Sequence, residues 1–334
     1  MRTLLTVILL AGTVMALPSV ASAQPAQTLL EGNLHGAKNP FRGSAITYRN
    51  AATAISFDEG AELTYNPNWA MSLEIAPRYW FGDSLFVMAS IDFTREITND
   101  DLSTDQGETW VGNTRLRVGA IRFYTIPEAE IAISANLDFI LPTSKWAQEQ
   151  TLYFGLQPSL RLSRGFDVLS GLNLGYGLSV LKNFNEFTTG ELEDSRIQNC
   201  SATPGGCYDG DFNSGLRNVS WRLANSFDAS LSFTEWMSLN ASFAILNSFL
   251  YDAYEDDTQT YLPVENTDMR TALVYDVSVT FIPLSYLWVT AGASTFNPQQ
   301  APDSSNYAPF FNRFTTLYID LRLDVADLVA TATR

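Results

Sequence analysis

Long segments in which apolar and polar residues alternate are the feature that most constrains how this chain can fold. In the clearest of them, residues 85–97, one face holds Leu85, Val87, Ala89, Ile91 and Phe93 and the other holds Met88, Ser90, Asp92, Thr94 and Glu96. A period of two residues is typical of a β-strand between two different surroundings. The segment is longer than the roughly five or six residues of an average strand, and about ten tilted residues can cross a membrane.

The same alternation recurs along the chain and gives twelve segments in all. They are 44–57, which is the weakest, 69–81, 85–97, 112–124, 131–141, 152–162, 172–178, 223–231, 239–245, 273–279, 287–293 and 317–323. We therefore predict an all-β fold, a transmembrane antiparallel up-and-down β-barrel of about twelve strands. An even number of strands places both termini in the periplasm.

The connections between these segments alternate in length. Short turns are expected at 82–83, 126–128, 164–165, 234–235 and 283–285, and longer loops at about 58–68, 98–110, 142–150, 183–217, 251–267 and 297–312. Short periplasmic turns and long extracellular loops are typical of outer-membrane barrels. Aromatic residues beside the short turns predict one interfacial girdle. They are Tyr79, Trp80, Phe81, Phe123, Tyr124, Phe166, Phe233, Trp236, Phe281, Tyr286 and Trp288.

The rival architecture is a secreted soluble sandwich or barrel, which would also show alternating strands. Its polar faces would be a wet outer surface rich in Lys and Glu. Here they consist mostly of Ser, Thr, Asn and Gly, and charged residues make up 17% of the chain, against about 25% in an ordinary soluble domain. Composition therefore favours the membrane barrel.

The N-terminus has the features of a cleaved signal peptide. Arg2 is followed by an apolar run over 4–17, and Ala21-Ser22-Ala23 precedes Gln24. The expected organisation is a signal peptide over 1–23, a periplasmic arm over 24–43, the barrel over 44–326 and a C-terminal tail over 327–334. The bacterial outer membrane is the expected location.

The polar faces of the strands predict a charged but nearly balanced lumen of seven cations and eight anions. The candidates for lining a solute path are Arg78, Arg115, Arg117, Arg161, Arg222, Asp228, Asp276 and Asp320. The remaining inward residues are Glu74, Asp92, Glu96, Asp138, Arg270, Arg322 and Asp324. Two alternatives remain open: small lumen residues such as Gly175 and Gly177 leave a narrow pore, or the charged groups pair and seal the interior.

The export signal, the polar lumen and the number of strands resemble small Gram-negative outer-membrane channels. The stretch Leu141-Pro142-Thr143-Ser144 is also similar to the Leu-Pro-Thr-Gly of transporter-like barrels grouped with aromatic-degradation pathways. The resemblance implies an outer-membrane channel or transporter. The chain departs from the commonest pattern because it ends in Thr331-Ala332-Thr333-Arg334 and has no terminal aromatic residue.

Catalytic chemistry is not expected. The one histidine, His35, precedes the first strand, so a histidine-based site inside the barrel is unavailable and we predict no enzyme, cofactor or metal site. The net charge is −16, or −17 once Arg2 is removed with the signal peptide, and this acidity disfavours nucleic-acid binding.

The longest loop carries Cys200 and Cys207, the two cysteines of the chain, and an exported protein predicts a disulfide between them. The stretch 209–215 begins like a calcium loop, but its glycine arrives one place late, which favours a plain turn. The acidic loops around 100–108 and 252–257 either bind divalent cations that bridge to outer-leaflet phosphates or form a solvated surface.

Two functions follow from these observations. The first is a channel or transporter for passive passage of small solutes, with lipid and lipopolysaccharide as further partners. The second is a closed structural or surface-interaction barrel that acts through its extracellular loops.

Overall fold

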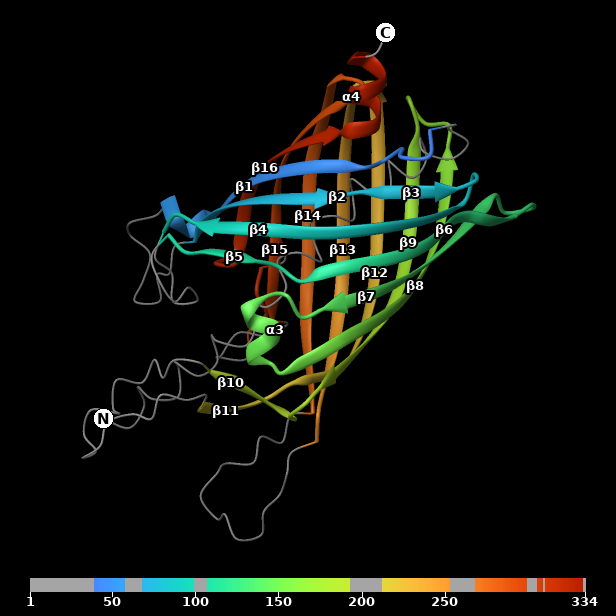
Figure 1. Ribbon diagram of the computed structural model, residues 1–334. Coiled ribbons are helices and arrows are strands. Elements are labelled where there is room, and N and C mark those ends of the chain that lie inside the picture. Colours follow the sequence, from blue (N-terminus) through green and yellow to red (C-terminus); the bar gives the residue numbers. More distant parts are fainter. Residues whose placement is uncertain are drawn as a thin grey trace, which may run out of the picture.

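A computed structural model describes residues 39–57, 68–98, 107–192, 212–252, 268–298, 305–308 and 310–332. Long antiparallel strands form a single wall that curves back on itself, and the strands of its near side cross those of its far side (Figure 1). Such crossing follows from the tilt of barrel strands, which is about 35–45° to the barrel axis.

The sheet of the wall has fourteen strands: the short β5 (Thr109–Val111) and thirteen longer segments whose bounds reflect the alternation in the sequence. They are β1 (Ala45–Thr53), β2 (Trp69–Ala76), β3 (Arg78–Phe81), β4 (Leu85–Glu96), β6 (Thr114–Ile126), β7 (Ile131–Leu141), β8 (Leu152–Phe166), β9 (Leu172–Asn185), β12 (Val219–Thr234), β13 (Met237–Leu250), β14 (Met269–Leu284), β15 (Leu287–Pro298) and β16 (Thr315–Asp324). Strands β2 and β3 are the halves of one crossing, interrupted at Pro77, which has no backbone N–H for the ladder. The wall therefore has twelve crossings, as predicted.

The first and last strands close the wall. Strand β1 pairs with β16 from Ala45↔Asp324 to Thr53↔Thr316, and on its other side it pairs with β2. Each remaining strand pairs antiparallel with its neighbours in the order of the chain. The predicted fold class, an antiparallel up-and-down barrel of twelve strands, is confirmed.

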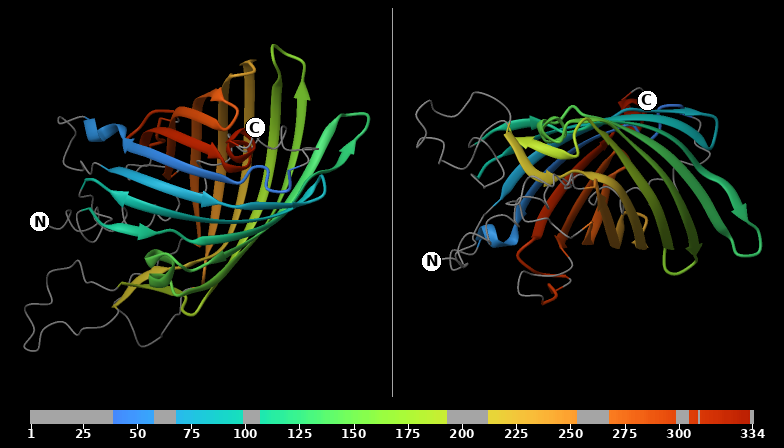
Figure 2. Two further views of the ribbon diagram at one scale, coloured as in Figure 1. Left: turned by 45° about the horizontal axis from the view of Figure 1, so that its top comes forward. Right: turned by 90° about the horizontal axis from the view of Figure 1, so that it is seen from below.

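The two ends of the barrel differ, as the lengths of the connections predicted (Figures 1 and 2). Short hairpins and the C-terminal helix α4 (Val325–Ala332) lie at one end, which we call the turn end. The other end, the loop end, carries η1 (Ala54–Phe57), β5 (Thr109–Val111), α3 (Lys145–Glu149) and the hairpin of β10 (Thr189–Leu192) and β11 (Phe212–Arg217). The turn predicted at 164–165 was misplaced, because β8 continues to Phe166.

The outward face is apolar. Leu73, Val87, Val118, Leu160 and Ile319 are among its exposed aliphatic side chains. Aromatic rings gather at both ends, so the sequence found only one of two girdles. Exposed rings at the loop end are Trp69, Tyr153, Phe154, Phe184, Phe187, Trp221 and Phe249.

The predicted turn-end girdle is corrected at two positions. Trp80 and Trp288 are 2% and 7% exposed and point into the barrel, whereas Tyr79, Phe81 and Trp236 are exposed. Trp80 is two residues from Arg78, and Trp288 is two residues from Thr290, so each lies on the same inner face as that neighbour. The alternation along the strand therefore decides their direction.

Several predicted features lie outside the described residues. These are the signal peptide, the arm up to residue 38, the Cys200–Cys207 disulfide and the calcium-loop-like stretch up to residue 211. In the described ranges, no helix is long and apolar enough to cross a membrane.

Candidate functional site

The candidate site is the inner wall of the barrel. All eight predicted lining residues lie on strands of the wall with side chains on its inner face, and the structure gives them different partners. Their role in solute passage remains a prediction.

Asp138 of β7 gathers two of the predicted arginines. Arg117, its cross-strand partner on β6, donates from Nε and Nη2 at 2.6 and 2.8 Å. Arg115 Nη1 lies 3.9 Å from the same carboxylate. Because Asp138 is 2% exposed, the fork-like pair holds a buried anion that would otherwise be costly.

Arg161 and Asp228 form an ion pair that skips one strand. Arg161 Nη2 of β8 lies 2.5 Å from Asp228 Oδ2 of β12, across β9. Gly175 of β9 lies between them, and a Cβ atom there would lie 2.6 Å from the Asp228 oxygens. The glycine therefore provides the space in which the two side chains meet.

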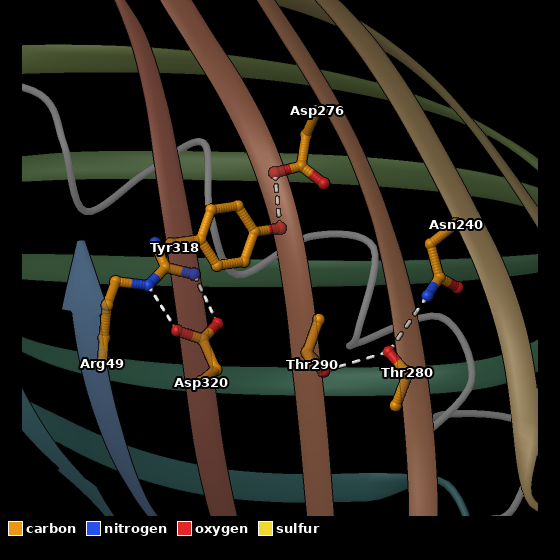
Figure 3. A network of polar contacts seen from close by, with 7 residues as sticks. All are labelled: Arg49, Asn240, Asp276, Thr280, Thr290, Tyr318 and Asp320. Carbon is orange, nitrogen blue, oxygen red and sulfur yellow. Dashed lines mark hydrogen bonds and ion pairs between the residues drawn. The ribbon is translucent and has the colours of Figure 1, made fainter. Parts of the chain in front are cut away.

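A polar network covers the inner wall at the seam where the barrel closes (Figure 3). Arg49 of β1 donates from Nε and Nη2 to the two carboxylate oxygens of Asp320 of β16 at 2.6 and 2.5 Å. The Arg49 guanidinium also lies 4.3 Å over the ring of Tyr318, whose hydroxyl donates to Asp276 Oδ2 at 2.7 Å. Asp276 is fully buried. These contacts join β1, β16 and β14.

A second group of side chains forms uncharged hydrogen bonds on neighbouring strands. Ser230 donates to Asn240 Oδ1, and Asn240 Nδ2 donates to Thr280, which shares a hydrogen bond with Thr290. All four side chains are buried. Hydrogen bonds between side chains thus link β12, β13, β14 and β15 across the inner wall.

An apolar cluster packs inside the barrel at the turn end. It consists of Trp80, Phe86, Ile121 and Trp288, with Met88 and Ile282 packed against it. The guanidinium of Arg42 stacks 3.9 Å over Trp80, and the guanidinium of Arg78 lies 4.5 Å over Phe86. Arg78 thus lies beside the cluster, where its Nη2 donates to Met88 Sδ at 3.4 Å.

Residues 39–44 border this cluster. The indole Nε1 of Trp80 donates to Arg42 O at 2.9 Å, and Arg42 Nη2 donates to the carbonyls of Gly82 and Asp83. Burial lowers the pKa of Arg42, although nearby Asp83 acts in the opposite direction. The described part of the predicted arm is therefore fastened to the β3–β4 turn.

The Leu141-Pro142-Thr143-Ser144 stretch forms a corner at the loop end. Thr143 accepts from Thr114 N and donates to Gly112 O at 2.7 Å. Ser144 caps α3 by accepting from Ala147 N at 3.1 Å, and it donates to Asn113 Oδ1. These bonds fix the start of the β7–β8 connection to the start of β6.

Hydrogen bonds also connect the bases of the loops. Asn185 and Asn218 both donate to Gln150 O, and Tyr251 donates to Asn183 O. Lys145 of α3 pairs with Glu108 at 2.6 Å. Glu108, one of the predicted acidic loop residues, is thus matched by a cation of this chain.

Arg222 differs from Arg115, Arg117 and Arg161, each of which lies within 4 Å of an aspartate. Its Nε donates to Ser248 Oγ at 2.9 Å, and no carboxylate of the portion of the chain that the structure describes forms an ion pair with it. Sequence reasoning missed Arg49, because the alternation of its strand is weak, and it missed Tyr318 as a partner of Asp276. No group of three or more potential metal ligands occurs among the described residues.

Known proteins that resemble this chain resemble it in fold. No family model matches the chain, and no curated protein matches it. Among solved structures, the chain is similar to an outer-membrane channel from Pseudomonas putida F1, with a TM-score of 0.54 and 10% identity over 87% of this chain and 98% of that one. This similarity supports the fold of an outer-membrane barrel.

Two further solved structures overlap with most of the chain at lower TM-scores. The NanC porin has a TM-score of 0.41 and 6% identity over 84% of this chain and 98% of that one. The translocator domain of the autotransporter NalP from Neisseria meningitidis has a TM-score of 0.38 and 12% identity over 89% of this chain and 92% of that one.

Proposed function

We propose that this protein is an outer-membrane channel for the passive passage of small solutes. The observation that carries the proposal is the inner wall: a closed ring of strands with an apolar exterior has an interior of hydroxyl, amide and paired charged groups. Such a wall can replace part of the hydration shell of a polar solute. The similarly folded protein from Pseudomonas putida F1 is itself an outer-membrane channel.

Small residues and paired charges define what this lumen would accept. Gly175, Gly177 and Gly292 lie on the inner wall where a larger side chain would collide with its neighbours. Arg49, Arg117 and Arg161 are each neutralised by an aspartate within 3 Å. Small solutes therefore fit the site better than large ones.

The proposed setting is the bacterial outer membrane with the turn end in the periplasm. The outward aliphatic surface between two aromatic girdles suits a lipid bilayer. The loop end would then face lipopolysaccharide, and the remaining acidic loop residues offer contacts to divalent cations. The signal peptide, the Cys200–Cys207 disulfide and the absence of catalysis belong to the same proposal.

Conductance of the purified protein in planar bilayers tests the channel. Discrete, long-lived current steps are expected in potassium chloride, and swelling of liposomes in small sugars should accompany them. Folding is checked separately by heat-modifiable mobility in gel electrophoresis. Silence of correctly folded protein in both assays would rule out the channel.

A closed barrel that acts through its loops is the second candidate, and one observation favours it. Trp80, Phe86, Ile121 and Trp288 are each less than 10% exposed and lie across the lumen at the turn end. If this cluster never opens, solutes cannot pass. The loop end, where hydrogen bonds hold the bases of the loops together, would then be the functional surface. The same silence in bilayers that defeats the channel would support this candidate.

A further inference from the structure

Arg222 is a lumen cation that no carboxylate among the described residues balances. It stands on the inner face of β12, paired in register with Leu181 of β9 and with Ser248 of β13. Its Nε bond to Ser248 Oγ leaves both terminal nitrogens of the guanidinium without an ion pair among the described residues. By contrast, Arg117 and Arg161 each have an aspartate within 3 Å.

The strands around Arg222 offer no nearby anion. Strand β13 carries no charged residue, and the inner face of β9 carries none either. The next inward carboxylate on β12 is Asp228, six residues away or about 20 Å along an extended strand. Asp228 already pairs with Arg161.

Ser248 has the geometry of an anion donor. Because its oxygen accepts from Arg222 Nε, its own O–H is free to donate to a third group. On its other side Ser248 is paired in register with Arg270 of β14, so two arginines flank one hydroxyl on three adjacent strands. Arg270 has contacts of its own and contributes its positive charge near the hydroxyl.

The surroundings strengthen any anion contact. Leu181, Leu246 and Leu250 are each less than 10% exposed on the neighbouring strands. In low-polarity surroundings the attraction between a guanidinium and an anion is larger than in water, and a cation left alone there is costly. A bound anion would remove that cost.

We propose that Arg222 and Ser248, flanked by Arg270, form a binding subsite for a small anion in the loop-end half of the lumen. The Arg222 guanidinium supplies the charge and the Ser248 hydroxyl a further donor. This inference rests on the proposed channel function and adds to it a preference for anionic solutes. Binding itself does not depend on whether the lumen conducts.

Chloride is the probe, and two measurements separate binding from passage. Broadening of the ³⁵Cl nuclear magnetic resonance signal reports binding to the detergent-solubilised full-length protein. The reversal potential in a potassium chloride gradient reports the permeability ratio of chloride to potassium. For Arg222→Gln we expect the chloride-specific broadening to fall several-fold and the permeability ratio to move toward potassium.

Matched variants make the result specific. Arg95→Gln removes the same charge from the exposed outer side of β4 and should leave both readouts at the wild-type value. Arg222→Lys keeps a cation and should retain part of the binding, which guards against misfolding as the cause. Ser248→Ala should weaken binding less than Arg222→Gln does.

Failure of the subsite and failure of the channel have different signatures. Equal broadening for wild type and Arg222→Gln would overturn the subsite, even if the wild type conducts. Chloride broadening that depends on Arg222 in an electrically silent protein would support the subsite and remove the channel.

Discussion

Gly175 shows how one missing side chain sets the contacts of two others. A methyl group at this position would press on both Arg161 and Asp228. We expect Gly175→Ala to separate the ion pair and to destabilise the barrel by about 1–3 kcal/mol, the usual cost of overpacking. Urea titration of folding into lipid bilayers measures the change.

A control for this substitution lies on the adjoining strand. A Cβ atom at Gly165 would meet nothing within 4 Å, so Gly165→Ala should leave the unfolding midpoint unchanged. If Gly175→Ala is as stable as Gly165→Ala, the close approach is not a constraint.

Substitution of Arg222 should change the stability of the barrel in the opposite direction. Since its cation has no carboxylate partner among the residues described, replacing it with Met removes a desolvation cost and keeps much of the side-chain volume. We expect Arg222→Met to leave the free energy of unfolding in low-chloride buffer unchanged or to raise it. Asp228→Asn, which removes the negative charge that pairs with Arg161, should instead lower it by about 3 kcal/mol. Destabilisation by both variants would mean that Arg222 has a structural role.

At the scale of elements, the last strand ends in a helix that Asp324 caps. Asp324 Oδ1 accepts from Asp327 N at 3.1 Å, and Val325 N donates to Ser44 O at 2.8 Å. Asp324→Ala should cost about 1 kcal/mol of helix stability and speed amide exchange in α4 about fivefold. Hydrogen exchange measured by mass spectrometry checks this.

The matched variant for the cap is Asp324→Asn, because asparagine is also a good N-cap residue. It should keep the exchange of α4 near the wild-type rate. Exchange that rises equally in both variants would point to the lost charge, beside Arg322, as the cause.

The strands were predictable because each one is a local pattern, and their ends were less so. Alternation found all twelve crossings, but the 44–57 segment ends as a strand at Thr53, where η1 begins. The hairpin of β10 and β11 and the helices α3 and α4 carry no alternation, and sequence reasoning missed them. Pairing between neighbouring strands and caps such as Ser144 decide these elements.

At the scale of the whole molecule, closure and the inner wall were only partly predictable. The alternation along each strand predicted which charged residues point inward. It could not predict that Arg161 and Asp228 form an ion pair, because that contact depends on how β8 and β12 are each aligned with β9. Trp80 and Trp288 were assigned to the girdle from residue type, although their parity with Arg78 and Thr290 already placed them inside. Residue type was the weaker signal there.

The turn-end cluster determines how the whole barrel would conduct. Apolar side chains across a lumen exclude water and narrow the path, so the cluster of Trp80, Phe86, Ile121 and Trp288 is the expected constriction. We expect Trp80→Ala combined with Trp288→Ala to give a larger unitary conductance than wild type in planar bilayers. Trp236→Ala, which removes an exposed indole at the same end, should conduct as wild type does. Unchanged conductance in the folded double variant would place the narrowest part of the path elsewhere in the barrel.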